Sequence, residues 1–273
     1  MARDMVAGLG DGPSGIIDSH AHVASGFSPW RSGSVPADIV STAAELGIGR
    51  SIVSSLGVDA MLENPTADEL VLANEAAWAA VIAHPELAGM VLCSGEHSRM
   101  SLDLMNRYIT DGPFVGIKLW IATRVSDPRV DAIAERAAEL GVPVLAHAWH
   151  KRVQEFQNES TPTDVATAAA RHPETTFIMA HLGGAGQRGV DEVAGLDNVV
   201  VDTSGGDPAP GLLEYAVSAL GPGRVIFGSD VPVRDPLTAL AKVHSAKLDA
   251  ATRQRILRDN AARVFTRLHS TEG

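Results

Sequence analysis

Short apolar runs recur along the chain, and each ends in one or more polar residues. The runs are bounded by turn-forming residues and alternate with longer segments whose apolar spacing is helical. This alternation is typical of repeated strand–helix units whose strands form a parallel sheet buried on both faces. Eight such runs occur, at 16–20, 50–55, 89–94, 115–120, 142–147, 175–181, 198–204 and 224–230.

The segments between the runs carry helix signals. Pro36 occupies a first helical position, and Gly47 and Gly141 follow the ends of two predicted helices. No Ser/Gly-rich linker and no shift in composition divides the chain, so we expect one domain over 15–270 after a flexible lead-in at 1–14. Eight units without a break predict a single (β/α)8 (TIM) barrel, which typically needs about 250 residues. The helices are predicted over 36–46, 68–83, 127–140 and 251–268.

Composition narrows the choice of partner. The chain has 273 residues and a formal net charge of -11, which argues against nucleic acid or an anionic membrane surface as the main partner. Cys93 is the only cysteine, so a metal would have to rest on histidines and carboxylates, and a reducing cytoplasm is expected. No apolar run approaches the roughly 18 residues of a membrane span, and no phosphate-binding glycine motif is complete. A small-molecule substrate is therefore expected, while assembly into a homo-oligomer stays open.

The ionisable residues fall into two groups. In a (β/α)8 barrel the chemistry gathers at the carboxyl ends of the strands. Four of the ten histidines lie at helix ends or within predicted helices, and we assign them to structure or solvent: His84, His172, His244 and His269. The residues at or near the ends of the strand runs are His20, His22, Lys118, His147, His181 and Asp230.

Strand alternation predicts which side chains share a face with these residues, because residues two apart in a strand point the same way. If His20 and His22 point inward, Ile16 and Asp18 are expected to point inward too. Lys118 is expected to point inward beside Gly116 and Trp120. The other inward pairs would be Leu145 with His147, Met179 with His181, and Gly228 with Asp230.

Imidazole nitrogens and carboxylate oxygens are the donors that hold a divalent ion such as Zn2+, at about 2.0 to 2.2 Å. Such an ion lowers the pKa of bound water to about 7. A second group must then accept or deliver a proton. The strand-end residues therefore predict a metal-dependent enzyme.

The same residues lie in segments that resemble the amidohydrolase superfamily. The resemblance is to the amidohydrolase-related (amidohydrolase 2) branch, which includes aminocarboxymuconate semialdehyde decarboxylase-like proteins, and it spans Ile16 to about Phe265. The matching segments are IIDSHAH, GIKLW, VPVLAH, IMAHLGG, VVVDTSG, VIFGSDVP and ILRDNAARVF.

The resemblance implies roles for the strand-end residues. It implies that the metal ligands are His20, His22, His147 and Asp230. It also implies that His181 either binds a second metal or works in acid–base catalysis, and that Lys118 either bridges two metals as a carboxylated lysine or does not bridge. The alternative for Lys118 is a charged side chain that is hydrogen-bonded in the barrel mouth. One ion, with Zn2+ expected, is favoured over two.

The loops after the strands supply candidates for substrate binding. Trp120, Arg124, Trp149 and His150 are predicted to contact the substrate, because a cation can hold a carboxylate and a tryptophan can cover a cyclic body. Together they suggest a small, anionic substrate. Asp18 is expected to orient His20 or His22, and the segment 202–204 to support the site rather than react.

The predicted function is a metal-dependent hydrolase that activates water for attack on a lactone, amide or ester carbonyl. Asp230 or His181 would handle the proton. One alternative is a metal-dependent non-oxidative decarboxylase of an aromatic or enoic acid, which needs the same residues. A second alternative is a non-catalytic relative that keeps the metal site.

Overall fold

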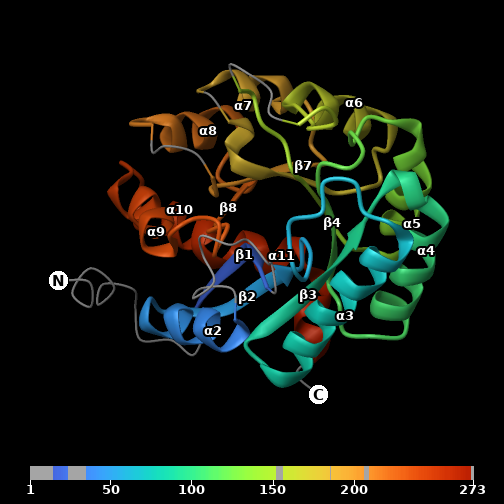
Figure 1. Cartoon of the computed structure of the whole chain (residues 1–273). Coiled ribbons are helices and arrows are strands. Elements are labelled where there is room, and N and C mark those ends of the chain that lie inside the picture. The colour runs from blue at the N-terminus through green and yellow to red at the C-terminus, as the bar shows by residue number, and fades with distance from the viewer. Residues whose placement is uncertain (1–14, 24–34, 152–155, 185, 206–208, 272–273) are drawn as a thin grey trace.

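In the computed structural model, eight parallel strands stand in chain order inside a ring of helices (Figure 1). The structure describes residues 15–23, 35–151, 156–184, 186–205 and 209–271, so the lead-in expected at 1–14 lies outside the described residues. The (β/α)8 barrel is confirmed. The strands are β1 (Ile16–His22), β2 (Ile48–Ser54), β3 (Leu87–Cys93), β4 (Gly116–Leu119), β5 (Val144–Ala146), β6 (Phe177–Met179), β7 (Val199–Asp202) and β8 (Val225–Ile226).

The helices follow the strands around the barrel. Their bounds are α2 (Pro36–Glu45), α3 (Ala67–Ala83), α4 (Ser98–Met105), α5 (Asp131–Leu140), α6 (Pro162–Arg171), α7 (Arg188–Val193), α8 (Leu212–Leu220), α9 (Pro236–Ser245), α10 (Ala250–Gln254) and α11 (Asn260–Val264). Gly141 ends α5 in the left-handed conformation that favours glycine. The predicted C-terminal helix is correct in extent but not regular: a π-helical turn at Arg255–Asp259 joins α10 to α11, and a 3-10 segment follows. Within the described residues no helix is long and apolar enough to cross a membrane.

The core has two layers. The inner layer lies within the barrel, because every strand or its immediate flank contributes to it, and residues of the C-terminal helix close its base. The outer layer packs the strands against the helices. Both layers consist mainly of aliphatic side chains with a few aromatic ones, and nearly all of them are buried, the arrangement expected for a parallel sheet covered on both faces. The inner residues include Ile17, Ile52, Met90, Leu145, Ile178, Val200, Ile226 and Phe265.

The predicted alternation holds on β4 and β5 but fails on β1 and β6. Ile17, not Ile16, belongs to the inner layer, because the pairing of β1 with β2 shifts register between these residues and again between Asp18 and Ala21. Met179 likewise packs outward, while its neighbours Ile178 and Ala180 pack inward. A register shift of one residue is enough to exchange the two faces of a short strand.

Seven strand ladders join β1 to β8, and individual contacts close the remaining seam between β8 and β1. One isolated bridge pairs Ala21 with Val231. The Ser19 amide donates to the Phe227 carbonyl at 3.0 Å, and the Ser19 hydroxyl donates to the same oxygen at 2.5 Å. The seam matters for function because His20, His22 and Asp230 all lie on it.

Candidate metal centre

Three side chains from the β1–β8 seam bring one ligand atom each to a common point. His20 Nε2 and His22 Nε2 are 3.2 Å apart, and Asp230 Oδ1 lies 3.5 Å from the first and 3.2 Å from the second. All three residues are buried. A tetrahedral site with bonds of about 2.0 to 2.2 Å separates its ligand atoms by about 3.3 to 3.6 Å. The triangle therefore has the dimensions of a metal site for a divalent ion.

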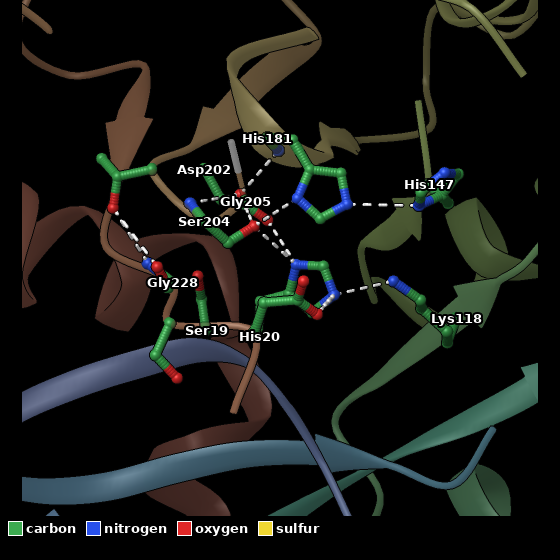
Figure 2. A network of polar contacts seen from close by, with 12 residues as sticks. Ser19, His20, Lys118, His147, His181, Asp202, Ser204, Gly205 and Gly228 are labelled. Carbon is green, nitrogen blue, oxygen red and sulfur yellow. Dashed lines mark hydrogen bonds and ion pairs between the residues drawn. The ribbon is translucent and has the colours of Figure 1, made fainter. Parts of the chain in front are cut away.

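Neighbouring hydrogen bonds set the orientation of both imidazoles. His20 Nδ1 lies 2.8 Å from Asp202 Oδ2 and 3.0 Å from the Ser204 hydroxyl, which leaves Nε2 directed at the triangle (Figure 2). His22 Nδ1 lies 3.1 Å from the hydroxyl of Ser54 on β2. The supporting role expected of segment 202–204 is thus visible in the geometry. Asp18, expected to orient these rings, instead accepts from backbone and hydroxyl groups at the seam.

Asp230 and His181 reach the centre from positions beyond their strands. β8 ends at Ile226 and β6 at Met179, so neither residue follows strand alternation. Both have left-handed backbones, with φ 64° at Asp230 and 66° at His181, which is uncommon for residues with a side chain. This conformation redirects the side chain relative to a strand. It explains why His181 joins the centre although Met179 packs outward.

His147 and His181 form a second pair beside the triangle. His147 Nδ1 lies 3.2 Å from His181 Nε2, and His181 Nδ1 lies 2.9 Å from the Ser204 hydroxyl (Figure 2). On its other side His147 Nε2 lies 2.8 Å from Oε1 of the fully buried Glu159. Among the described residues, two sets of three donors lie within 4.8 Å of one another, namely His20, His22 and Asp230, and His20, His181 and Asp202. His147 is in neither set, so its role as a ligand stays a prediction.

Lys118 extends from β4 to the edge of the triangle. Its side chain is fully buried, and Nζ lies 2.9 Å from His20 Nε2. Burial lowers the pKa of Lys118 to about 8, although the negative charges of Asp230 and Asp202 oppose the shift. A neutral amine is the form that can be carboxylated, so the contact is compatible with either role inferred for this lysine.

Burial and hydrogen bonding shift the pKa values of the residues at the centre. Burial lowers the pKa of His22 to about 4 and holds the pKa of His181 well below its usual range, so both imidazoles are neutral near pH 7. Burial alone would raise the pKa of Asp230, but its hydrogen bond with His22 and the neighbouring imidazoles hold that pKa well below its usual range. Neutral imidazoles beside an ionised carboxylate are the protonation states that bind a cation. The donor set therefore fits a divalent ion.

A cavity of about 390 Å³ opens over His147, His181 and Asp230. Its walls include the rings of Trp120, Trp149 and Phe156, and two cations, Lys151 and Arg234, also line it. Lys151 Nζ lies 2.8 Å from Glu159 Oε1, and the Arg234 guanidinium lies 5.6 Å from the centre of the Trp149 ring. Within the described part of the chain, Arg234 has no carboxylate partner.

The structure brings only two of the four predicted substrate-binding residues to this cavity. Trp120 and Trp149 line it. Arg124 turns outward to Asp164, 3.4 Å away, and to the Gln157 carbonyl, while His150 pairs with Glu192 at 3.0 Å.

Arg234 and Glu159 belong to the site but were not among the residues predicted from the sequence. Arg234 lies four residues after Asp230 in a segment that begins beyond the predicted strand, and Glu159 follows His147 by twelve residues in a loop without periodicity. The sequence signal available for Arg234 was its place in a loop after a strand, the same signal that selected Arg124.

Comparisons with solved structures confirm the fold. A dihydroxybenzoic acid decarboxylase from Polaromonas, solved with manganese and 2-nitroresorcinol, superposes with a TM-score of 0.76 at 16% identity, covering 93% of this chain and 97% of that one. The 2,6-dihydroxybenzoate decarboxylase from Rhizobium gives 0.74 at 16% identity, covering 93% and 99%. A Pseudomonas putida protein provisionally assigned as a 2-pyrone-4,6-dicarboxylic acid hydrolase gives 0.66 at 20% identity, covering 93% and 98%.

Sequence comparison identifies the family. No curated protein sequence matches the chain significantly. A family model described as amidohydrolase matches residues 17–267, which is nearly the whole chain and contains every residue of the candidate centre. The protein, with its eight-stranded barrel and its His-X-His pair and aspartate on the seam, belongs to the amidohydrolase-2 family.

Proposed function

We propose that the protein is a metal-dependent hydrolase whose substrate is a small, planar carboxylic acid that carries a lactone, amide or ester group. The enzyme hydrolyses this group. The observation that carries the proposal is the triangle of His20 Nε2, His22 Nε2 and Asp230 Oδ1, with edges of 3.2 to 3.5 Å. Asp230 also lines the cavity. His147 would complete the ligand set of one Zn2+. When bound, the ion polarises the substrate carbonyl and lowers the pKa of water.

The protein's own residues supply the proton transfers. Asp230 is ionised, because its neighbours hold its pKa low, and it accepts the proton of the attacking water. His181 is neutral and lines the same cavity, so it can take up this proton and pass it to the leaving oxygen or nitrogen. The Ser204 hydroxyl at His181 Nδ1 fixes the ring, and Nε2 on its other side faces His147.

The upper part of the cavity recognises the rest of the substrate. Trp120, Trp149 and Phe156 provide flat apolar walls suited to a planar body. Arg234 offers a guanidinium that can take a carboxylate in a bidentate pair. Lys151 contributes less free charge, because Glu159 already neutralises it.

A second candidate is non-oxidative decarboxylation of an aromatic or enoic acid. The aromatic walls next to a proton-carrying group favour it, since the reaction breaks a carbon–carbon bond, releases CO2 and protonates the remaining carbon. The same Asp230 or His181 would deliver that proton. The decarboxylases that share the fold make this reaction worth the direct comparison.

One experiment separates the two reactions. The metal-loaded protein is incubated in oxygen-18 water with a panel of lactones, amides and esters of planar carboxylic acids, together with hydroxybenzoic and enoic acids. Mass spectrometry is expected to show an oxygen-18 label in a hydrolysed product, whereas bicarbonate release with an unlabelled product would support decarboxylation. His20→Ala and Asp230→Asn should abolish turnover and weaken metal binding. Retention of both metal and turnover in these variants would contradict the proposal, and metal binding without any turnover would favour a non-catalytic relative.

A further inference from the structure

One buried carboxylate ties together the two backbones that carry the metal triangle. Asp18 Oδ1 accepts from the His20 amide at 3.2 Å and from the Ser229 amide at 2.9 Å. Asp18 Oδ2 accepts from the Ser229 hydroxyl at 2.5 Å. Asp18 and Ser229 are almost completely buried. The chain segments of His20 and Asp230 therefore share an acceptor at the seam where no continuous strand ladder is described.

The bonds continue on both sides of Asp230. The Asp230 amide donates to the His20 carbonyl at 2.7 Å, and the Val231 amide donates to the Ser229 hydroxyl at 3.1 Å. The His22 amide donates to the Val231 carbonyl at 2.7 Å. Asp230 is thus held between two anchored neighbours while its own φ is 64°. A left-handed backbone at an aspartate is costly and persists only where its surroundings impose it.

We propose that Asp18 and Ser229 are positioning residues that hold Asp230 in its left-handed conformation and so keep its carboxylate at the metal triangle. Neither residue touches the ligand atoms. Without the Ser229 hydroxyl, the segment 229–231 loses one of its two hydrogen bonds to Asp18 and the acceptor for the Val231 amide, and only the Ser229 amide still donates to Asp18. Asp230 can then relax toward negative φ, which turns its carboxylate away from His20 and His22.

The inference rests on the proposed function only in taking Asp230 as a metal ligand, and its test measures metal affinity rather than turnover. Ser229→Ala is combined with Asp230→Ala in a double-mutant cycle, with Zn2+ affinity measured by competition with a chelator. Ser229→Ala alone is expected to weaken binding about 10-fold or more, as loss of a group that orients a ligand typically does. In the Asp230→Ala background the same change should alter affinity less than about twofold, because the ligand it positions is already gone.

Ser19→Ala is the matched control. It also removes a buried hydroxyl bond across the seam, but that bond goes to Phe227 and not to the Asp230 segment. It should lower thermal stability and leave Zn2+ affinity within about twofold of wild type. Equal losses of affinity in Ser19→Ala and Ser229→Ala, or an equal effect of Ser229→Ala in both backgrounds, would overturn the proposal. Asp18→Asn takes the place of Ser229→Ala in the cycle if the latter fails to fold.

Absence of metal binding by the wild-type protein would overturn the proposed function, and the positioning of Asp230 would then be read from hydrogen exchange. The Asp230 amide, bonded to the His20 carbonyl, should exchange faster in Ser229→Ala than in wild type or Ser19→Ala. Unchanged exchange of this amide in Ser229→Ala would overturn the positioning role.

Discussion

His20 Nδ1 lies 2.8 Å from Asp202 Oδ2, a hydrogen bond that joins β1 to β7 across the buried barrel mouth. The Asp202 carboxylate also accepts from the His181 amide through Oδ1, at 2.9 Å. One residue of β7 therefore orients an imidazole of the triangle and fixes the backbone of the acid–base candidate. Because His20 donates from Nδ1, its Nε2 lone pair remains available to a metal.

Asp202→Asn should weaken metal binding by about 10-fold to 100-fold. An asparagine can still accept one hydrogen bond, but it lacks the charge that favours donation from Nδ1 of His20. Competition titration against a chelator measures the effect. Asp197→Asn, which changes an exposed aspartate paired with Arg224, is the control and should bind metal as wild type does. Unchanged affinity in Asp202→Asn would mean that His20 keeps its orientation without this carboxylate.

Arg234→Leu should raise KM for a carboxylate substrate about 10-fold to 100-fold, because a hydrogen-bonded charge pair contributes about 1.5 to 3 kcal/mol. The effect on kcat should be smaller, since the Arg234 guanidinium contributes no ligand atom to the triangle. Arg124→Leu is the matched control: its guanidinium pairs with Asp164 outside the cavity, so KM should stay within about twofold of wild type. A larger effect on KM from Arg124→Leu than from Arg234→Leu would mean that Arg124, the arginine predicted from the sequence, binds the substrate carboxylate.

These two arginines illustrate which features of the site could be predicted from the sequence and which could not. The barrel was predictable because strands covered on both faces read as short apolar runs, and such runs recur eight times. The set of strand-end residues was predictable because the carboxyl ends of parallel strands meet at one rim. Loop residues have no comparable rule. Arg124 and Arg234 both follow strands, and only the folded loops show that one turns toward Asp164 while the other lines the cavity.

Irregular backbone conformation is the second reason why parts of the site could not be predicted from the sequence. His181 and Asp230 join the centre through left-handed residues beyond short strands, and alternation cannot anticipate such a turn. In β1 the register shift between Asp18 and Ala21 exchanged the expected faces, so Ile17 replaced Ile16 in the barrel interior. Glu159 contacts His147 from a loop whose path depends on the fold. The strained and irregular positions are also the ones nearest the proposed chemistry, as is common at functional sites.

The metal-free protein should lose stability as pH falls from about 6.5 to about 4. Burial lowers the pKa of His22 to about 4, whereas the unfolded chain binds the same proton near 6.5. Protons are therefore taken up first by the unfolded state, so the stabilisation is fully present above pH 6.5 and is lost on acidification. The shift in pKa corresponds to a loss of about 3 kcal/mol in the free energy of unfolding once the pH is below 4. Urea unfolding in the presence of a chelator should show a shallower pH dependence in His22→Gln, and identical slopes in the two proteins would contradict the assignment.

Gly205→Ala should impair catalysis by displacing His181. Gly205 has φ +70°, and a Cβ added to it would lie 2.3 Å from His181 Nδ1, so the ring would have to move away from the Ser204 hydroxyl and from His147. Gly211→Ala is the matched control, since Gly211 has a similar φ of +81° and nothing lies within 4 Å of its added Cβ. Both variants should lose about 1 to 2 kcal/mol of stability from the left-handed backbone.

Only Gly205→Ala should also lower kcat, by about 100-fold or more if His181 transfers the proton. Thermal unfolding and turnover measured on the same two proteins separate the backbone cost from the displacement of the ring. Equal turnover in Gly205→Ala and Gly211→Ala would show that the position of His181 does not limit the reaction, and the proton transfer would then fall to Asp230 alone.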